Sequence, residues 1–309
     1  MVDMVDMVDM TSGHPTTVGI APAGYRLPAG TSIGAVRLQV SDIGRSTDYY
    51  ERVIGLHVQQ RSRTLVTLGV GAGSASLVVL ETREGVRPAA RRATLGLYHF
   101  AILLPDRASL GRFLAHLSAI GAYAGMSDHL VSEALYLSDP DGLGIEVYAD
   151  RPRETWTYDG RQLAMATNPL NAGDLIAAGG GVAWDGAPEG TVIGHVHLHV
   201  GDLAGAEAFY HSALGFDKTV WEYPGALFLS AGGYHHHLGT NTWAPGPVPP
   251  ADQARLLYWE LFVPRDGDAA AAAHSLSRAG YSAAEIPGGW SATDPWGTTV
   301  HILDATARR

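Results

Sequence analysis

The feature that most constrains this fold is a segment that occurs twice. Residues 34–42 read GAVRLQVSD, and residues 194–202 read GHVHLHVGD. The similarity continues with YYERVIGL at 49–56 against FYHSALGF at 209–216, and with DPDG at 139–142 against DPWG at 294–297. Self-similarity over such a long period indicates repeated structural modules. A chain of 309 residues has room for two domains of ordinary size, so we expect two homologous modules.

Each module divides again into two similar units. In the first unit, the residue types over 33–40 alternate between two faces, as in a strand. Asp42 can then cap a following helix, and Gly55 can end that helix. Short strands follow at 64–68 and 75–81. The second unit repeats this order, with strands at 98–104, 134–138 and 144–148 and a helix at 110–120. We therefore expect a βαβββ unit four times. The predicted organisation is a disordered N-terminal segment at 1–28, a first module at 29–150, a connector at 151–190 and a second module at 191–305.

Composition excludes several functional classes. The formal net charge is −10, which disfavours a nucleic-acid partner because phosphate binding needs a basic surface. No apolar run reaches the length needed to span a bilayer, and the N-terminal MVDMVDMVDM lacks the basic start and apolar stretch of a signal peptide. The chain has no cysteine, which excludes thiolate ligands and a cysteine nucleophile. We expect a cytoplasmic protein with small-molecule partners and no membrane partner, either a monomer or a homo-oligomer.

The residue types that bind metals are distributed differently in the two modules. His99 and Glu146 lie in the first module, and His195 and His237 lie in the second. This distribution indicates one metal site shared between the halves. Two imidazoles and one carboxylate are the usual donors of Fe(II) enzymes that activate oxygen, because they leave adjacent coordination positions open. A single strand histidine is more often a packed or surface residue, so the prediction depends on the joint placement of these residues.

Four stretches identify a family resemblance. GLYHFAILLPDR, SEALYLSDPDGLGIEVYADRP, GHVHLHVGDL and GGYHHHLGTNTW resemble the vicinal oxygen chelate superfamily, which includes glyoxalases, bleomycin resistance proteins and extradiol dioxygenases. The match is closer to two-module bacterial catechol 2,3-dioxygenase-like proteins and covers roughly residues 30–305. The resemblance implies an α+β fold of two vicinal-oxygen-chelate modules, each a pair of βαβββ units forming a cupped mixed sheet.

The resemblance also implies where metal ligands stand. Pairing the second unit of the first module with the first unit of the second module brings together His99, Glu146 and His195, which are the predicted ligands. The complementary pairing brings together Ala35, Glu81, Tyr258 and His301, which is a poor metal site. We therefore expect one active cup built across the two modules and one degenerate cup.

Acid–base catalysis requires a further group near the metal. The run Tyr-His-His-His at 234–237 can supply it. If this run is a strand, residues 235 and 237 share one face and residue 236 points away. We therefore expect His235 or His237 as the acid–base residue, with Tyr258 as a further catalytic candidate. The predicted substrate-pocket residues are His197, Asn241, Trp243, Tyr136 and His129. The alternatives are core packing for the aromatic residues and a polar turn for His129.

The predicted activity is extradiol-type cleavage of a catechol or related dihydroxy aromatic by O₂, with Fe(II) as cofactor and Mn(II) as the alternative metal. Two other functions compete with it. A glyoxalase-type isomerase or lyase uses a closed set of four ligands with more carboxylates, often on Zn or Ni. A metal-free protein that binds an aromatic ligand would need none of these donors.

Overall fold

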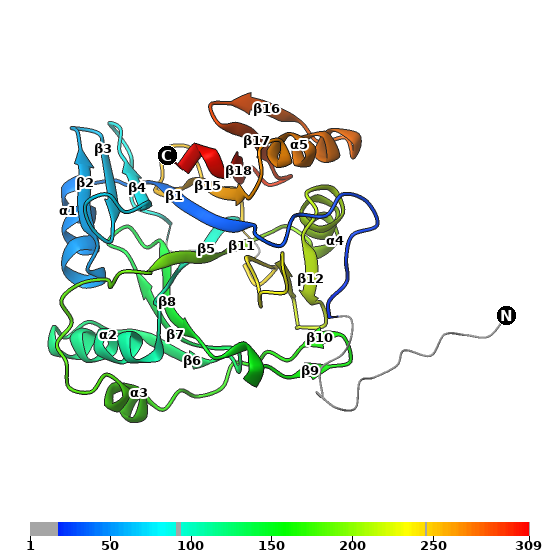
Figure 1. Ribbon diagram of the computed structural model, residues 1–309. Helices are drawn as coiled ribbons and strands as arrows, with labels where there is room; N and C mark the ends of the chain where they lie inside the picture. The colour runs from blue at the N-terminus through cyan, green and yellow to red at the C-terminus, as the bar shows by residue number, and fades with distance from the viewer. Residues whose placement is uncertain (1–17, 91–93, 245, 309) are drawn as a thin grey trace.

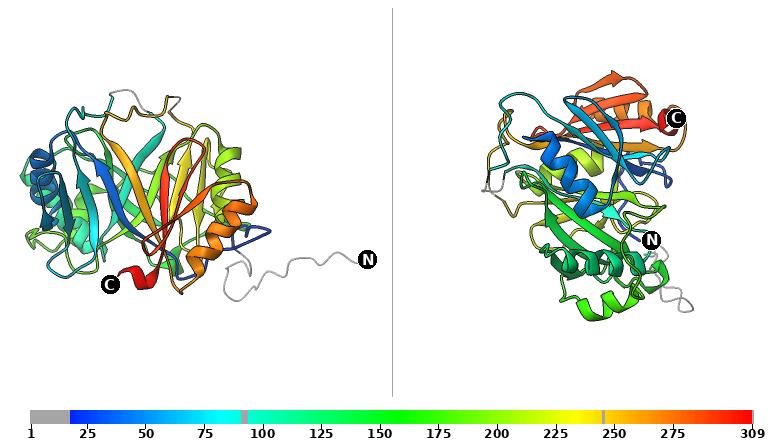
Figure 2. Two further views of the ribbon diagram at one scale, coloured as in Figure 1. Left: turned by 90° about the horizontal axis from the view of Figure 1, so that it is seen from above. Right: turned by 90° about the vertical axis from the view of Figure 1, so that its left-hand side faces the viewer.

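The computed structural model describes residues 18–90, 94–244 and 246–308. Two eight-stranded mixed sheets form the body of the protein, and their central strands lie side by side in the middle of the molecule (Figure 1). The helices lie at two opposite ends, with α1 and α2 at one end and α4 and α5 at the other (Figure 2). Among the described residues, no helix is both long and apolar enough to cross a membrane.

The first module contains the two predicted βαβββ units. The first unit comprises β1 (Ser32–Gln39), α1 (Ile43–Tyr49) with a π-helical continuation at Tyr50–Ile54, β2 (His57–Arg61), β3 (Leu65–Gly69) and β4 (Ser76–Glu81). The second comprises β5 (Gly96–Leu103), α2 (Arg107–Ala119), β6 (Gly125–Asp128), β7 (Ser132–Ser138) and β8 (Gly144–Asp150). As predicted, the Asp42 carboxylate accepts the Arg45 N–H at the helix start, and Gly55 ends the helix with a φ of 84°.

The second module repeats this order. Its first unit comprises β11 (Val192–His199), α4 (Leu203–Ala206) with a π-helical continuation at Glu207–Ala213, β12 (Asp217–Val220), β13 (Ala226–Ser230) and β14 (Leu238–Asn241). Its second comprises β15 (Arg255–Val263), α5 (Asp268–Arg278), β16 (Ala283–Ile286), β17 (Gly289–Thr293) and β18 (Thr299–Asp304), with a 3₁₀ turn at Ala305–Arg308.

Each sheet takes one unit from each module. One sheet has the order β12-β13-β14-β11-β5-β8-β7-β6, and the other has the order β16-β17-β18-β15-β1-β4-β3-β2. The antiparallel pairs β5–β11 and β1–β15 join the modules. The α+β class and the pairing of the second unit with the third are confirmed. The two units of one module, however, lie in different sheets. We call the sheet that contains β5 and β11 the first cup, and the other sheet the second cup.

One hydrophobic core joins both sheets. Its largest fully buried side chains include Trp259 of the second cup and Phe100 of the first cup. Tyr50, from the π-helical turn, packs against Phe100 and donates a hydrogen bond to Asp139 of the DPDG turn. Burial of side chains from both modules in one cluster holds the two sheets together.

The expectation of disorder over residues 1–28 is wrong for its last part. Residues 1–17 lie outside the described residues, whereas residues 18–28 pack against the second module. Leu27 is buried, and the Arg26 guanidinium donates two hydrogen bonds of 2.7 Å to the Asp217 carboxylate. The apolar side chain and the paired charge offset the entropy of ordering this segment, which composition alone did not reveal.

The connector between the modules is also built into the fold. It contains a short hairpin of β9 (Tyr158–Asp159) and β10 (Gln162–Leu163), a 3₁₀ turn at Arg153–Thr155, and helix α3 (Ala172–Ala178), which packs on α2. Leu175 of α3 is fully buried. An added Cβ at Gly111 of α2 would collide with the Leu175 carbonyl, so glycine permits the close approach of the two helices. The boundaries at 29–150, 151–190 and 191–305 stay predictions.

Candidate active site

Three adjacent strands bring His99, Glu146 and His195 together on one face of the first cup. Ala101 on β5 is the backbone partner of both His195 on β11 and Glu146 on β8. Residues in such a row share one face of a sheet, and His99 lies two positions before Ala101 and shares it too. Ala101 is fully buried and small, so the three longer side chains converge above it.

The three side chains form a compact, buried group. His99 Nε2 lies 2.9 Å and His195 Nε2 lies 3.2 Å from Glu146 Oε2. One donor atom from each residue lies within 4.8 Å of the others, and each residue is at most 4% exposed. His99 Nε2 does not have the geometry of a hydrogen bond to the carboxylate, and it has no other partner among the described residues. A buried nitrogen of this kind, beside a carboxylate and a second imidazole, fits a metal ion.

The protonation states of these groups also suit metal ligation. Burial lowers the pKa of His195 to about 4, so its imidazole is neutral at pH 7. Burial by itself would raise the pKa of Glu146, but the neighbouring His195 and His99 rings hold it well below its usual range. Neutral imidazole and ionised carboxylate are the forms that bind metals.

A β-bulge adds an aromatic side chain to the same wall. His197 is paired with His99, whereas the next residue, Leu198, is paired with Leu97, so Tyr98 is the extra residue of β5. Such an extra residue locally redirects side chains. The Tyr98 ring consequently lies beside the rings of His99 and His197, at centroid distances of 4.8 and 5.2 Å.

Tyr136 and His129 form a hydrogen-bonded pair beside the donor group. Tyr136 on β7 is the backbone partner of Glu146, and its ring lies 5.6 Å from that of His99. His129 Nε2 lies 2.6 Å from the Tyr136 hydroxyl, and His129 Nδ1 lies 2.6 Å from the Ala166 carbonyl. Because a carbonyl can only accept, Nδ1 carries the proton and Nε2 accepts from the tyrosine. The alternative interpretation of His129 as a polar turn residue does not account for this contact with Tyr136.

Asn241 orients two histidines of β11. Its amide nitrogen lies 2.9 Å from His197 Nε2, and its carbonyl oxygen accepts from His199 Nδ1 at 2.7 Å. An added Cβ at Gly239 would contact the His197 ring, so this glycine makes room for it. Trp243, which is 46% exposed, lies at the edge of the group with its ring 5.6 Å from that of His197.

The structure overturns the expected orientation of the three consecutive histidines. Residues 231–237 form turns before β14 and are not part of a strand, so the side chains do not alternate. His236 faces the site, with its ring 4.1 Å from that of His195. His235 lies behind it and contacts Asp150, and the His237 ring accepts the Ala231 N–H. Sequence analysis missed His236, although Gly232 and Gly233 signal a turn at this point.

Tyr258, expected as a catalytic residue, belongs to the second cup. It lies on β15, where it stacks on His301 at 3.8 Å and accepts a hydrogen bond from Arg37. Arg37 also forms an ion pair with Glu81, and Ala35 stands at the position that His195 has in the first cup. Among the described residues, the only group with metal-ligand spacing is His99, Glu146 and His195.

A cavity of about 380 Å³ lies against His99 and Glu146 of the donor group. Its volume is within the range of small-molecule sites. Four of the five predicted pocket residues line it, and Asn241 lies behind His197. The lining includes His99, Glu146, His236, Tyr98, Tyr136, His129, His197, Phe228, Tyr223 and Trp243. Aromatic walls around a few convergent polar groups suit a small aromatic ligand.

Comparison with known proteins gives consistent results. The chain is similar to a catechol-2,3-dioxygenase of Bacillus subtilis (strain 168), with 43% identity over 270 residues, 86% of this chain and 94% of the relative. Among solved structures, a putative dioxygenase from Bacillus subtilis subsp. subtilis str. 168 has a TM-score of 0.63 at 13% identity, covering 91% of this chain and 86% of the other. Glyoxalase I from Zea mays has a TM-score of 0.54 at 18% identity, covering 90% and 94%.

These two structural similarities concern the fold alone. A family model described as the Glyoxalase/Bleomycin resistance protein/Dioxygenase superfamily matches residues 32–147 and 192–302, which include nearly all strands of both sheets. Together with the relative at 43% identity, this match confirms the predicted resemblance. The chain belongs to the glyoxalase/bleomycin resistance protein/dioxygenase superfamily.

Proposed function

We propose that this protein is an extradiol-type ring-cleaving dioxygenase that opens a catechol or a related dihydroxy aromatic with O₂. The observation that carries the proposal is the buried group of two histidines and one carboxylate, of which His99 and Glu146 line an aromatic-walled cavity. The similarity to a catechol-2,3-dioxygenase supports the same activity.

The donor set and this relative indicate a metal cofactor. We assign its ligands as His99, Glu146 and His195, and the metal as Fe(II), with Mn(II) as the alternative. The bound metal supplies the Lewis acidity and the open coordination positions that oxygen chemistry requires.

His236 is the group best placed to move a substrate proton. Asp150 Oδ1 accepts from His235 Nε2 at 2.9 Å, and His235 Nδ1 lies 2.6 Å from His236 Nδ1. If both rings are neutral, His235 donates through Nε2 and accepts at Nδ1, so the shared proton belongs to His236 Nδ1. This arrangement leaves His236 Nε2 free to accept a proton from a catechol hydroxyl in the cavity.

The remaining residues orient and enclose the substrate. His129 holds the Tyr136 hydroxyl beside Glu146, where the tyrosine oxygen can accept a hydrogen bond from a substrate hydroxyl. Burial, followed by the Glu146 charge, raises the pKa of Tyr136 well above its ordinary value, so the hydroxyl stays protonated. The rings of Phe228 and Trp243 provide apolar surfaces that pack against an aromatic ring and displace water.

The reaction class is tested by loading the protein separately with Fe(II) and Zn(II) and assaying two reactions. We expect the Fe(II) form to consume one O₂ per catechol and to give a yellow ring-opened product that contains both oxygen atoms. The Zn(II) form should cleave no catechol, because zinc has no accessible redox change.

Isomerisation of a thiohemiacetal by the Zn(II) form, with no O₂ uptake by the Fe(II) form, would instead establish a glyoxalase-type activity. Tight binding of catechols by protein that retains no metal after anaerobic reconstitution would establish a metal-free binding protein. Either result contradicts the proposal.

A further inference from the structure

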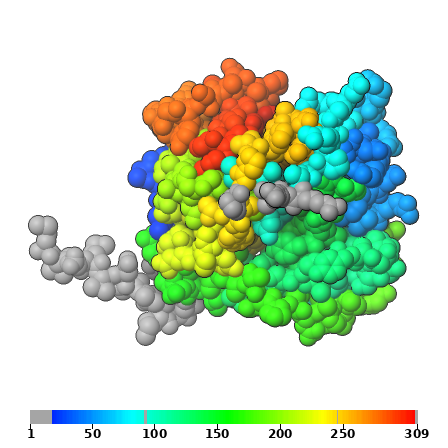
Figure 3. Space-filling model, turned by 180° about the vertical axis from the view of Figure 1, so that it is seen from behind, coloured from blue at the N-terminus to red at the C-terminus, as the bar shows by residue number. Residues whose placement is uncertain are grey.

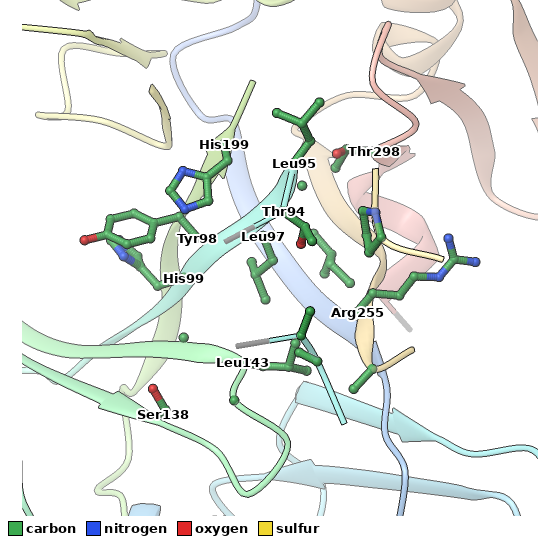
Figure 4. A pocket seen from close by; sticks show the side chains of 18 of the residues that line it. Thr94, Leu95, Leu97, Tyr98, His99, Ser138, Leu143, His199, Arg255 and Thr298 are labelled. Atoms are coloured by element: carbon green, nitrogen blue, oxygen red, sulfur yellow. The ribbon is translucent and has the colours of Figure 1, made fainter. Parts of the chain in front are cut away.

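A second and larger cavity adjoins the active-site cavity. Its volume is about 670 Å³, and Tyr98, His99 and Tyr136 line both cavities. Its walls come from the first strand of the second unit, the turn before β8 and the start of β15 (Figure 4). Seen from behind, these cyan, green and gold segments meet on one face of the molecule (Figure 3). The second cavity therefore lies between the two cups and next to the metal donors.

The walls of the second cavity combine several large apolar side chains with a similar surface of polar groups. The larger apolar side chains include Leu95, Leu97, Leu143, Val248, Leu256 and Trp296. Among the described lining residues there is no aspartate or glutamate, although the chain has 31 acidic residues against 21 lysines and arginines. Because these lining residues carry no negative charge, the cavity favours an apolar or anionic ligand over a cationic one.

Arg255 is the one lysine or arginine among the described lining residues, and it lies across the cavity from Tyr98 and His99 (Figure 4). Its Nε is buried and has no hydrogen-bond partner within the described residues. The Arg255 side chain as a whole is half-buried and makes no ion pair within the described residues, so an anionic acceptor that reaches its guanidinium gains a charge-assisted hydrogen bond.

We propose that the second cavity binds the substituent of the substrate, and that this substituent is an apolar chain ending in a carboxylate. The assignment rests on the proposed function, because it places the dihydroxylated ring in the active-site cavity. The chain then passes Tyr98, contacts the leucines of the second cavity, and ends at Arg255. The active-site cavity by itself suits a single ring, and the larger cavity beside it has room for a long substituent.

The test is anaerobic calorimetric titration of the Fe(II) protein with three ligands: catechol, 4-hexylcatechol and 6-(3,4-dihydroxyphenyl)hexanoate. Burial of apolar surface predicts a gain in affinity of up to about fourfold per methylene group. The variant Arg255→Met should lower the affinity for the carboxylate ligand relative to hexylcatechol by about tenfold to a hundredfold.

Two further variants test the contribution of the cavity space and control for the loss of an arginine. Thr94 lines the second cavity, and Thr94→Phe fills part of it, so the affinity for hexylcatechol relative to catechol should fall. Arg61→Met removes an exposed arginine of β2 outside both cavities, and it should leave the affinity ratios as in the native protein. Equal affinities for catechol and hexylcatechol, or an unchanged carboxylate preference in Arg255→Met, would overturn the assignment.

Oxygen uptake with the same compounds distinguishes this assignment from the proposed function. If catechol is cleaved but the chain compounds bind no more tightly, the second cavity does not hold the substituent and the function stands. If the chain compounds bind as expected but none consumes O₂, the cavity assignment stands as a ligand site and the dioxygenase proposal fails.

Discussion

Replacing Glu146 by glutamine should reduce the Fe(II) affinity by more than about 100-fold. Loss of a group that only supports a metal ligand already costs about 10–100-fold, and Glu146 is the single carboxylate of the donor group. The neutral amide removes the negative charge that offsets the metal ion while preserving the size of the side chain. Anaerobic titration with Fe(II), followed by desalting and elemental analysis, should show about one iron per native chain and almost none in the variant.

Glu81→Gln is the matched control, because Glu81 is a carboxylate of the second cup and bonds to Arg37. Its iron content should equal that of the native protein. Circular dichroism should show that both variants are folded. Full iron content in Glu146→Gln, or loss of iron in Glu81→Gln, would show that the metal is held elsewhere.

His236→Ala should keep its iron and lose about 10²–10⁴-fold in kcat. This range is the usual contribution of a general acid–base group. The His236 ring lines the cavity and is held by His235, but it is not part of the donor group. Steady-state oxygen uptake with catechol, together with iron analysis of the same sample, measures both properties.

His237→Ala is the control in the neighbouring position. His237 Nδ1 accepts the Ala231 N–H at 3.2 Å and does not line the active-site cavity, so this variant should lose about 1–3 kcal/mol of stability with little change in kcat. Chemical denaturation measures the first effect. Loss of iron in His236→Ala would make His236 a metal ligand, and unchanged kcat would remove it from proton transfer.

The donor group could be predicted because the family resemblance implies which strand positions hold ligands, and the repeat shows which residues stand at those positions. Aligning the two modules shows that neither holds two histidines and a carboxylate at equivalent positions. Only the pairing of β5 and β8 with β11 combines His99, Glu146 and His195, and the structure has this pairing. Strand periodicity then places all three on one face.

The misplaced residues have physical explanations. The predicted orientation of the three histidines assumed that residues 234–237 form a strand with alternating side chains. These residues instead follow the turn at Gly232 and Gly233 and form no strand, so His236 faces the site in place of His235 and His237. Tyr258 stands at the His99 position of the other cup, in agreement with the complementary pairing, so its place in the fold is that of the second cup and not of the donor group. The bulge at Tyr98 depends on the register between β5 and β11, and the second cavity depends on how the two sheets pack, and no local pattern encodes either.

Anomalous diffraction at the iron edge, from crystals of the Fe(II) protein grown without oxygen, tests most directly whether units from both modules hold one metal ion. We expect a single peak within about 2.0–2.3 Å of His99 Nε2, His195 Nε2 and a Glu146 oxygen. A peak in the second cup beside His301, or one that contacts residues of a single module only, would contradict the account.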